Sequence, residues 1–188
     1  MNRSIREIEN TDIEQTIISE DINGRITYYM YVETFDGLYT PIGIELPQGK
    51  GPFPLVLMAS GNGGGAMSWL KENLRNRRYT MEKLLEQGIA CGWIRYRAEV
   101  DLGYHEGGTL VRDSWQGGDM FNRSPLEYED EIAIIEYLKT YQEIDENRIG
   151  LLGMSHAGEM ILKITSEYQG ICAAVASEPA AHEFLALT

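Results

Sequence analysis

Hydrophobic and polar positions along the chain first predict a pair of strands. Ile26–Thr34 is rich in aromatic and β-branched residues, which favour the β conformation. Turn residues at positions 35–37 separate this run from a second predicted strand, Leu38–Leu46, so the two are expected to form an antiparallel hairpin. The following run, Leu55–Ala59, is uniformly apolar, as expected of a strand that is buried on both faces of a sheet.

The rest of the chain alternates helix and strand signals. A helix is predicted from about Thr80 to a stop at Gly88, and another begins after the aperiodic 28-residue segment Arg97–Ser124. Ser124 is the expected N-cap of that second helix, and Glu127 completes a capping box. The order implies a mostly parallel α/β sheet of six strands, with helices on both faces. The remaining predicted elements are the strands Ile89–Tyr96, Arg148–Met154 and Ile171–Ser177 and the helix Ser155–Tyr168.

The length of 188 residues fits one domain, which is expected to span residues 1–188 and to begin with a polar extension over residues 1–20. No internal repeat or interdomain linker interrupts the pattern. No stretch approaches the ~18 apolar residues of a membrane-spanning helix, and residues 1–20 lack the apolar core of a secretory signal. These features predict a soluble, cytoplasmic protein.

Acidic residues outnumber basic ones, 29 to 16, and give a net charge of −13. We expect no nucleic-acid partner, because nucleic-acid backbones are bound by basic surfaces. The most acidic segment, Glu127–Glu146, has helical periodicity, which favours a solvated helix face over a cation site. Cys91 and Cys172 lie in apolar runs, which predicts two buried free thiols and excludes a disulfide framework or zinc cluster. We expect no metal, no cofactor and no membrane contact.

The turn over residues 153–158, Gly-Met-Ser-His-Ala-Gly, carries the strongest chemical signal. It joins an apolar strand to an amphipathic helix, which is the setting of a nucleophile elbow. Small residues flank Ser155, so the two backbones can pass close together and the hydroxyl is pushed out above the sheet edge. The helix N-terminus adds a favourable dipole where an oxyanion would form. A serine at such a junction is otherwise often a plain N-cap, but in this context Ser155 is the predicted nucleophile.

At this turn the chain resembles the α/β-hydrolase superfamily, and within it the prolyl oligopeptidase and dienelactone hydrolase-like branch. Gly153, Ser155, Gly158 and Met160 carry the likeness, since they fit the G-x-S-x-G-G-x-M type of elbow in that branch, although Ala157 replaces one glycine. The opening strand pair and the strand and turn at residues 54–61 agree with it. The likeness runs over residues 26–180 and implies a sheet of eight strands, whose last strands would be missing here.

A glycine-rich stretch over residues 60–65 follows the third predicted strand. The resemblance implies an oxyanion hole here, formed by the backbone amide of Gly61 or Asn62 together with that of His156. The family has a His-Gly-Gly-x-Gly stretch at this place, and Ser60 stands where its histidine would be. Residues 61–66 also satisfy the dinucleotide pattern G-x-G-x-x-A. Nucleotide binding is disfavoured, because two strands precede the motif and no acid closes the next strand at the required spacing. A flexible turn is the plain alternative.

A catalytic serine needs a base within hydrogen-bond reach and an acid that orients this base. The resemblance places the acid after the seventh strand and the histidine after the eighth, and only 33 residues follow Ser155. The chain is therefore expected to stop before its acid and base, and as an incomplete domain it is expected to show little hydrolytic activity. Glu178 and His182, which follow the last predicted strand, are the alternatives within the chain. His105 and His156 are expected to contact substrate or to pack.

The predicted function is hydrolysis of an ester or peptide bond through an acyl-enzyme on Ser155, with a small-molecule ester or a peptide as substrate. The alternative is a non-catalytic α/β-hydrolase-like remnant or binding module that lacks the acid and the base. Aromatic residues in the segment Arg97–Ser124 make it a candidate pocket wall. If the sheet ends at Ile171–Ser177, this strand leaves an apolar edge, so self-association through the edge is expected.

Overall fold

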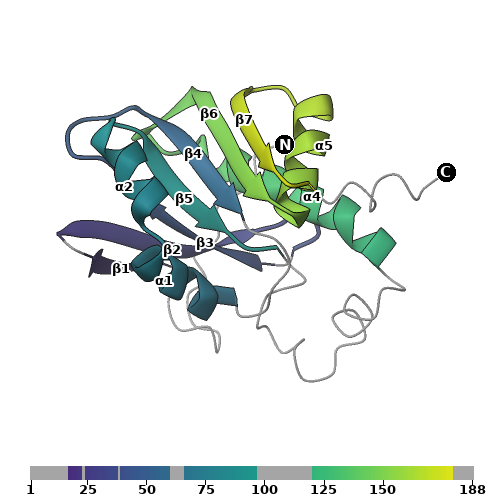
Figure 1. Ribbon diagram of the computed structural model, residues 1–188, viewed down its shortest axis with the longest axis horizontal. Coiled ribbons are helices and arrows are strands. Elements are labelled where there is room, and N and C mark those ends of the chain that lie inside the picture. The colour runs from purple at the N-terminus through teal and green to yellow at the C-terminus, as the bar shows by residue number, and fades with distance from the viewer. Residues whose placement is uncertain (1–16, 23, 38, 60–65, 97–119, 180–188) are drawn as a thin grey trace.

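The computed structural model describes residues 17–22, 24–37, 39–59, 66–96 and 120–179, and its centre is one β-sheet. Within these ranges the sheet has seven strands in the order β1-β2-β3-β5-β4-β6-β7 (Figure 1). Helices cover both faces, so the α/β fold class that the sequence predicts is confirmed. No helix in this part of the chain is long and apolar enough to cross a membrane.

The first three strands are antiparallel and form one side of the sheet. β2 (Arg25–Glu33) and β3 (Tyr39–Glu45) pair in the predicted hairpin. β1 (Ile17–Ile22) pairs with β2 and was not predicted, because the polar residues at 19–21 weaken its apolar signal. The stretch assigned to a polar extension, residues 1–20, thus includes the start of a strand, and the described sheet has one strand more than the six predicted.

The other four strands are parallel to one another and lead to the candidate site. They are β4 (Phe53–Ala59), β5 (Ala90–Ile94), β6 (Ile144–Met154) and β7 (Ile171–Ser177). β4 is central and pairs with both β5 and β6, so the chain runs outward from β4 to β5 and then returns across β4 to β6. β2 runs in the same direction, because it is antiparallel to β3, which is antiparallel to β5. Most of the described strands therefore point the same way, as predicted.

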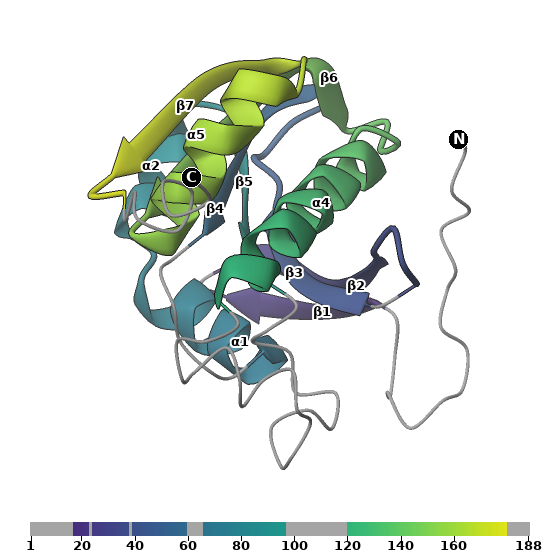
Figure 2. The same ribbon diagram turned by 90° about the vertical axis from the view of Figure 1, so that its right-hand side faces the viewer.

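Two pairs of helices pack on opposite faces of the sheet. α1 (Ala66–Asn76) and α2 (Tyr79–Glu86) cover one face, and α4 (Met120–Leu138) and α5 (His156–Glu167) lie side by side on the other (Figure 2). α2 is followed by Gly88 at φ +74°, which agrees with the predicted stop. α1 was not predicted. The first face buries Leu70, Leu74, Met81 and Leu85, and the second buries Ile134, Leu138, Met160 and Ile164.

α4 begins one turn earlier than predicted and turns part of its acidic surface inward. Its first residue is Met120, so Ser124 lies inside the helix and is not its N-cap. The prediction of a solvated face over Glu127–Glu146 is also wrong in part, because some of these acids continue the inward-facing stripe of α4. Glu127, Asp130 and Glu131 are buried, whereas Glu129, Glu136, Glu143 and Glu146 are exposed.

A buried ion pair ties the junction of α1 and α2 to the end of β3. Two guanidinium nitrogens of Arg78 lie 2.7 and 2.8 Å from the two carboxylate oxygens of Glu45, which is fully buried. Thr27 donates a hydrogen bond of 2.5 Å to the same carboxylate. Arg78 also donates to the carbonyl of Leu74 and to the carboxylate of Glu82. The Arg78–Glu45 pair is therefore bidentate, and bidentate arginine–carboxylate pairs are among the stronger charged hydrogen bonds in proteins.

β7 forms one edge of the described sheet, and most of its residues are exposed. Val175 has 56% of its surface exposed, as expected of an apolar edge strand. Cys172 of the same strand is exposed, so the prediction of a buried thiol is wrong there, because an apolar run on an edge strand lacks full cover. The prediction is confirmed for Cys91, whose thiol pKa is raised by burial.

Candidate active site

The carboxyl ends of β4 and β6 lie side by side where the strand order reverses. Ala59 of β4 pairs in register with Gly153 of β6. Ligand sites in open parallel sheets form at such a switch point, outside the carboxyl ends of the strands. Ser155 lies between the end of β6 and the start of α5. The topology therefore points to the same place as the sequence motif, and does so independently of it.

The backbone of Ser155 has φ 57° and ψ −120°. These angles belong to the first central position of a type II′ turn, which glycine usually occupies. A non-glycine residue held there stores strain of order 1–3 kcal/mol. The half-buried Ser155 side chain makes no capping hydrogen bond to α5, so the plain N-cap interpretation does not describe this serine. The sharp strand-to-helix turn is the backbone form of a nucleophile elbow.

Gly153 lets the backbones of β6 and α5 pass close together at this turn, and Gly158 lets α5 approach the end of β7. A Cβ atom on Gly153 would lie 2.8 Å from the backbone of Ala157 and 2.7 Å from Cδ1 of Ile161. A Cβ atom on Gly158 would lie 3.1 Å from Cα of Pro179, just beyond the end of β7. The predicted reason for small residues around the serine is thus confirmed by the distances.

The end of β7 is tied to the same turn. The amide of Ser155 donates a 3.0 Å hydrogen bond to the carbonyl of Ser177. Glu178, the next residue, is exposed and has φ 46°. Ser155 and Glu178 are the two non-glycine residues with positive φ within the described ranges, and they follow adjacent strands. The structure therefore brings the predicted nucleophile and one candidate acid to neighbouring strand ends. The candidates His105, His182, Gly61 and Asn62 lie outside the described residues.

The side chain of His156 is buried among α4, α5 and Tyr96, which lies two residues beyond the end of β5. Its Nε2 atom lies 2.5 Å from Oε2 of Glu127, and its Nδ1 atom lies 3.9 Å from Oε2 of Glu159. The ring of Tyr96 meets the imidazole edge-on, with 5.3 Å between the ring centroids. His156 thus has the surroundings of a packing residue, while its backbone opens α5 next to Ser155.

Glu131, one helical turn after Glu127, belongs to the same buried group. Its Oε2 atom accepts a hydrogen bond of 3.0 Å from the hydroxyl of Tyr96. Burial raises the pKa of Glu131 to about 7, although the Tyr96 hydrogen bond and the charge of His156 act in the opposite direction. We refer to Tyr96, Glu127, Glu131, His156 and Glu159 together as the His156 cluster.

The His156 cluster was not predicted from the sequence. One signal could have revealed its α4 members. Glu127 and Glu131 stand at helical spacing ahead of Ile134 and Leu138, so they continue an apolar stripe that faces the core. Acids on such a stripe need polar partners inside the protein.

In the described part of the chain no group of three or more His, Cys, Asp or Glu side chains is arranged to hold a metal ion.

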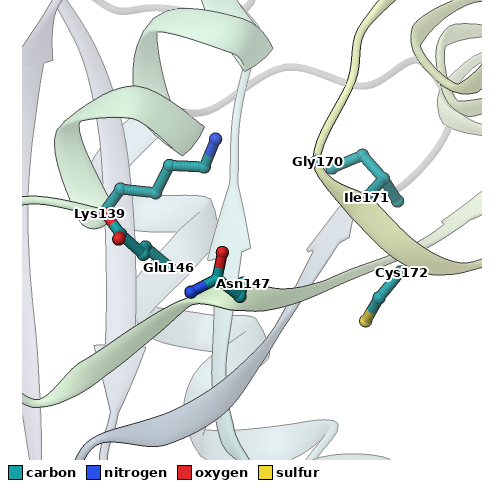
Figure 3. Close-up of a pocket in the computed structure, with 6 residues that line it drawn as sticks. All are labelled: Lys139, Glu146, Asn147, Gly170, Ile171 and Cys172. Carbon is teal, nitrogen blue, oxygen red and sulfur yellow. The ribbon is translucent and has the colours of Figure 1, made fainter.

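An open cavity of about 390 Å³ lies at the amino ends of β6 and β7, at the other end of these strands from Ser155 (Figure 3). Residues at the starts of β6 and β7 line it, together with Lys139 just after α4. The Lys139 ammonium donates to Glu136 and to the Tyr168 hydroxyl. The cavity lies at the amino ends of these strands, whereas Ser155 follows the carboxyl end of β6. Sites in parallel sheets form at the carboxyl ends, so we do not assign this cavity to the chemistry of Ser155. The lining residues are Lys139, Glu146, Asn147, Gly170, Ile171 and Cys172.

Comparison with known proteins finds hydrolases. Residues 125–184, about a third of the chain, match the family described as BAAT / Acyl-CoA thioester hydrolase C terminal. The matched residues include β6, α5, β7 and therefore Ser155. A 2,6-dihydropseudooxynicotine hydrolase from Paenarthrobacter nicotinovorans is 27% identical over 132 residues, which make up 68% of this chain and 29% of that protein.

Solved structures share the fold at low sequence identity. A prolyl endopeptidase matches 81% of this chain and 21% of its own, with a TM-score of 0.63 and 16% identity. A protein from Klebsiella pneumoniae described as a dienelactone hydrolase matches 84% of this chain and 61% of its own, with a TM-score of 0.61 and 18% identity. The chain thus spans less than two thirds of each of these proteins. The likenesses confirm the resemblance first seen at the Ser155 turn.

Proposed function

This chain has the α/β-hydrolase fold of the prolyl oligopeptidase and dienelactone hydrolase group, and we propose that it is a serine hydrolase with Ser155 as its nucleophile. The proposed reaction is hydrolysis of an ester or peptide bond through an acyl-enzyme. The matched family includes thioester hydrolases, which supports an acyl compound as the substrate class. The relative from Paenarthrobacter nicotinovorans is a hydrolase, which supports hydrolysis as the reaction type.

The strained backbone of Ser155 is the observation that carries this proposal. A serine without a chemical role could be replaced by glycine, which adopts φ 57° without strain. The strain is instead kept at the switch point of the sheet, next to the close approach at Gly153. Strain of this kind persists where the surrounding structure enforces it, and such places are often functional.

In the proposed first step, Oγ of Ser155 attacks the acyl carbon and its proton passes to a general base. The amide of His156 at the N-terminus of α5 is the proposed donor to the oxyanion, aided by the helix dipole. The carbonyl then re-forms, the bond to the leaving alcohol or amine breaks, and the base gives its proton to the leaving group. Water attacks the acyl-enzyme in the same way, releases the acid and restores the Ser155 hydroxyl.

Glu178 is the candidate acid within the described residues. It follows Ser177, whose carbonyl accepts the amide hydrogen of Ser155, so its backbone lies close to the nucleophile. His156 does not suit the role of base, since its imidazole is buried against Glu127. The proposed base therefore comes from residues outside the described ranges, with His182 as one candidate.

Hydrolysis of p-nitrophenyl acetate by the full-length protein tests the proposal, with Ser177→Ala as a matched control at the end of the neighbouring strand. We expect turnover with an initial burst from the acyl-enzyme, and a loss of at least ~10³-fold in kcat for Ser155→Ala. Ser177→Ala should retain activity within about twofold, because an exposed side chain at a strand end rarely matters. Absence of turnover in the wild type, or equal turnover in Ser155→Ala, would contradict the proposal and favour the non-catalytic alternative.

A further inference from the structure

We propose that Glu127 and His156 form a positioning pair, in which Glu127 of α4 fixes the residue next to Ser155 and so holds the nucleophile turn in its strained form. Glu127 has no contact with substrate in this proposal, since it acts through His156. The consequence for catalysis rests on the proposed function of Ser155. The effect on the turn itself follows from the geometry of the pair.

The pair is short, buried and links two separate helices. Nε2 of His156 and Oε2 of Glu127 are 2.5 Å apart, and both side chains are at most 1% exposed. A hydrogen bond joins Nε2 of His156 to this carboxyl group, so the ring and the acid fix each other's position. Tyr96 packs against the ring, and Glu159 faces its other nitrogen. The imidazole is thus held between α4, α5 and Tyr96, which fixes its orientation.

His156 passes this constraint to Ser155 through one peptide bond. The bond is planar, so the orientation of the His156 backbone and the ψ angle of Ser155 move together. Two backbone hydrogen bonds hold the turn from the β7 and α5 sides. The Ser155 amide donates to Ser177 at 3.0 Å, and the Glu159 amide donates to the Ser155 carbonyl at 3.2 Å. The hydrogen bond between Glu127 and His156 fixes the turn from the α4 side in the same way.

The chain offers a control with the same chemistry at a distance from the turn. Glu45 is a buried carboxylate bonded to a basic side chain, Arg78, on the α1 and α2 face of the sheet. A pair that only stabilises the domain should affect all protected amides alike when its carboxylate is lost. A positioning pair should affect the Ser155 turn more than the rest of the sheet.

Amide hydrogen exchange, followed by NMR, separates these two roles in the folded protein. The amides of Ser155 and Glu159 report on the turn, and the amide of Leu57 in β4 reports on the core. In Glu127→Ala we expect the two turn amides to exchange at least about tenfold faster relative to Leu57 than in the wild type. Glu127→Gln should show a smaller increase, because its side-chain amide still forms a hydrogen bond with Nε2 of His156. Glu45→Gln should leave the ratio unchanged.

The same variants test the consequence for catalysis. We expect Glu127→Ala to slow phosphonylation of Ser155 by a fluorophosphonate about 10- to 100-fold, with partial rescue in Glu127→Gln. An unchanged exchange ratio in Glu127→Ala, or the same change in Glu45→Gln, would overturn the positioning role. If Glu127→Ala does not fold, an unchanged ratio in Glu127→Gln overturns it as well. A wild type that is not phosphonylated at Ser155 contradicts the proposed function, whereas the exchange ratio still decides this inference.

Discussion

The two faces of the sheet bury charged side chains in different ways. On the α1 and α2 face, Arg78 donates hydrogen bonds to both carboxylate oxygens of Glu45, and these bonds raise the pKa of the guanidinium. On the α4 and α5 face, the His156 cluster gathers three carboxylates around one imidazole and one phenol. There burial raises the pKa of Glu131 to about 7. The Arg78–Glu45 pair joins one positive and one negative side chain, whereas the His156 cluster contains a carboxyl group, Glu131, that burial makes easier to protonate.

The difference indicates what each group does for the protein. Matched, two-pronged ion pairs fix elements to one another, and the Arg78 pair joins a helix junction to a strand end. A buried carboxyl with a raised pKa lowers stability at neutral pH, and such groups gather at functional sites. The His156 cluster lies beside the strained Ser155 turn. Proteins tolerate a loss of stability at functional sites, so the destabilising burial of Glu131 fits a place next to the proposed nucleophile.

The largest effect should come from breaking the matched pair. Arg78→Met leaves the Glu45 carboxylate buried without its main partner, and we expect a loss of about 3–5 kcal/mol in the free energy of unfolding, measured with urea. Arg75→Met removes an exposed pair with Glu20 and should leave the free energy of unfolding nearly unchanged, because solvent screens such pairs. Equal losses in both variants would show that the buried Arg78–Glu45 pair stabilises the fold no more than the exposed Arg75–Glu20 pair.

A smaller, pH-dependent effect should come from Glu131→Gln. The folded protein favours the protonated carboxyl, so Glu131 contributes stability below pH 4.5 that is lost as the pH rises through about 7. Between these values the variant should gain up to about 3 kcal/mol on the wild type. Urea unfolding at several pH values measures this. Glu136→Gln is the control, because burial raises the Glu136 pKa but hydrogen bonds from Tyr168 and Lys139 lower it overall. Parallel curves for wild type and Glu131→Gln would contradict the account.

Two glycines of β6 test the close approach behind Ser155. Gly153→Ala brings a methyl group to within 2.8 Å of the Ala157 backbone, so we expect a loss of about 1–3 kcal/mol in the free energy of unfolding. Gly150→Ala is its control on the same strand. Its new Cβ would have no neighbour nearer than 3.4 Å, and it should cost less than about 1 kcal/mol. If Gly153→Ala is as stable as Gly150→Ala, the turn is looser than described.

The smallest effect concerns the strain at Ser155. Glycine accepts φ 57° freely, so Ser155→Gly should be about 1 kcal/mol more stable than Ser155→Ala, which keeps the strain. At the extended position Ser177 in β7, the order should reverse, because glycine weakens a strand. Urea midpoints of the four variants measure both differences. An alanine variant as stable as the glycine variant would show that Ser155 is not strained.

Much of the fold was predicted from the sequence, because periodicity records which side of an element faces the core. The hairpin of β2 and β3, the buried strand β4 and the helix α5 follow this rule. β1 was missed because edge strands do not need an apolar face. The start of α4 was misplaced because a capping pattern at Ser124 is also compatible with a helix interior.

The candidate site was predicted only where its chemistry is local in sequence. Ser155 and its glycines lie within six residues, so the turn could be recognised from its composition. The His156 cluster joins Tyr96, Glu127 and His156, which are far apart in the chain. Their meeting depends on how α4 packs against α5, and a single sequence does not record this packing.

Labelling of the full-length protein with a fluorophosphonate, followed by digestion and mass spectrometry, is the most direct test of Ser155 as the nucleophile, because the reaction needs an activated serine. The account predicts one phosphonyl adduct, located on Ser155, which is absent from Ser155→Ala and from protein unfolded before labelling. An adduct on another residue, labelling that persists in Ser155→Ala, or an unlabelled native protein would contradict the account.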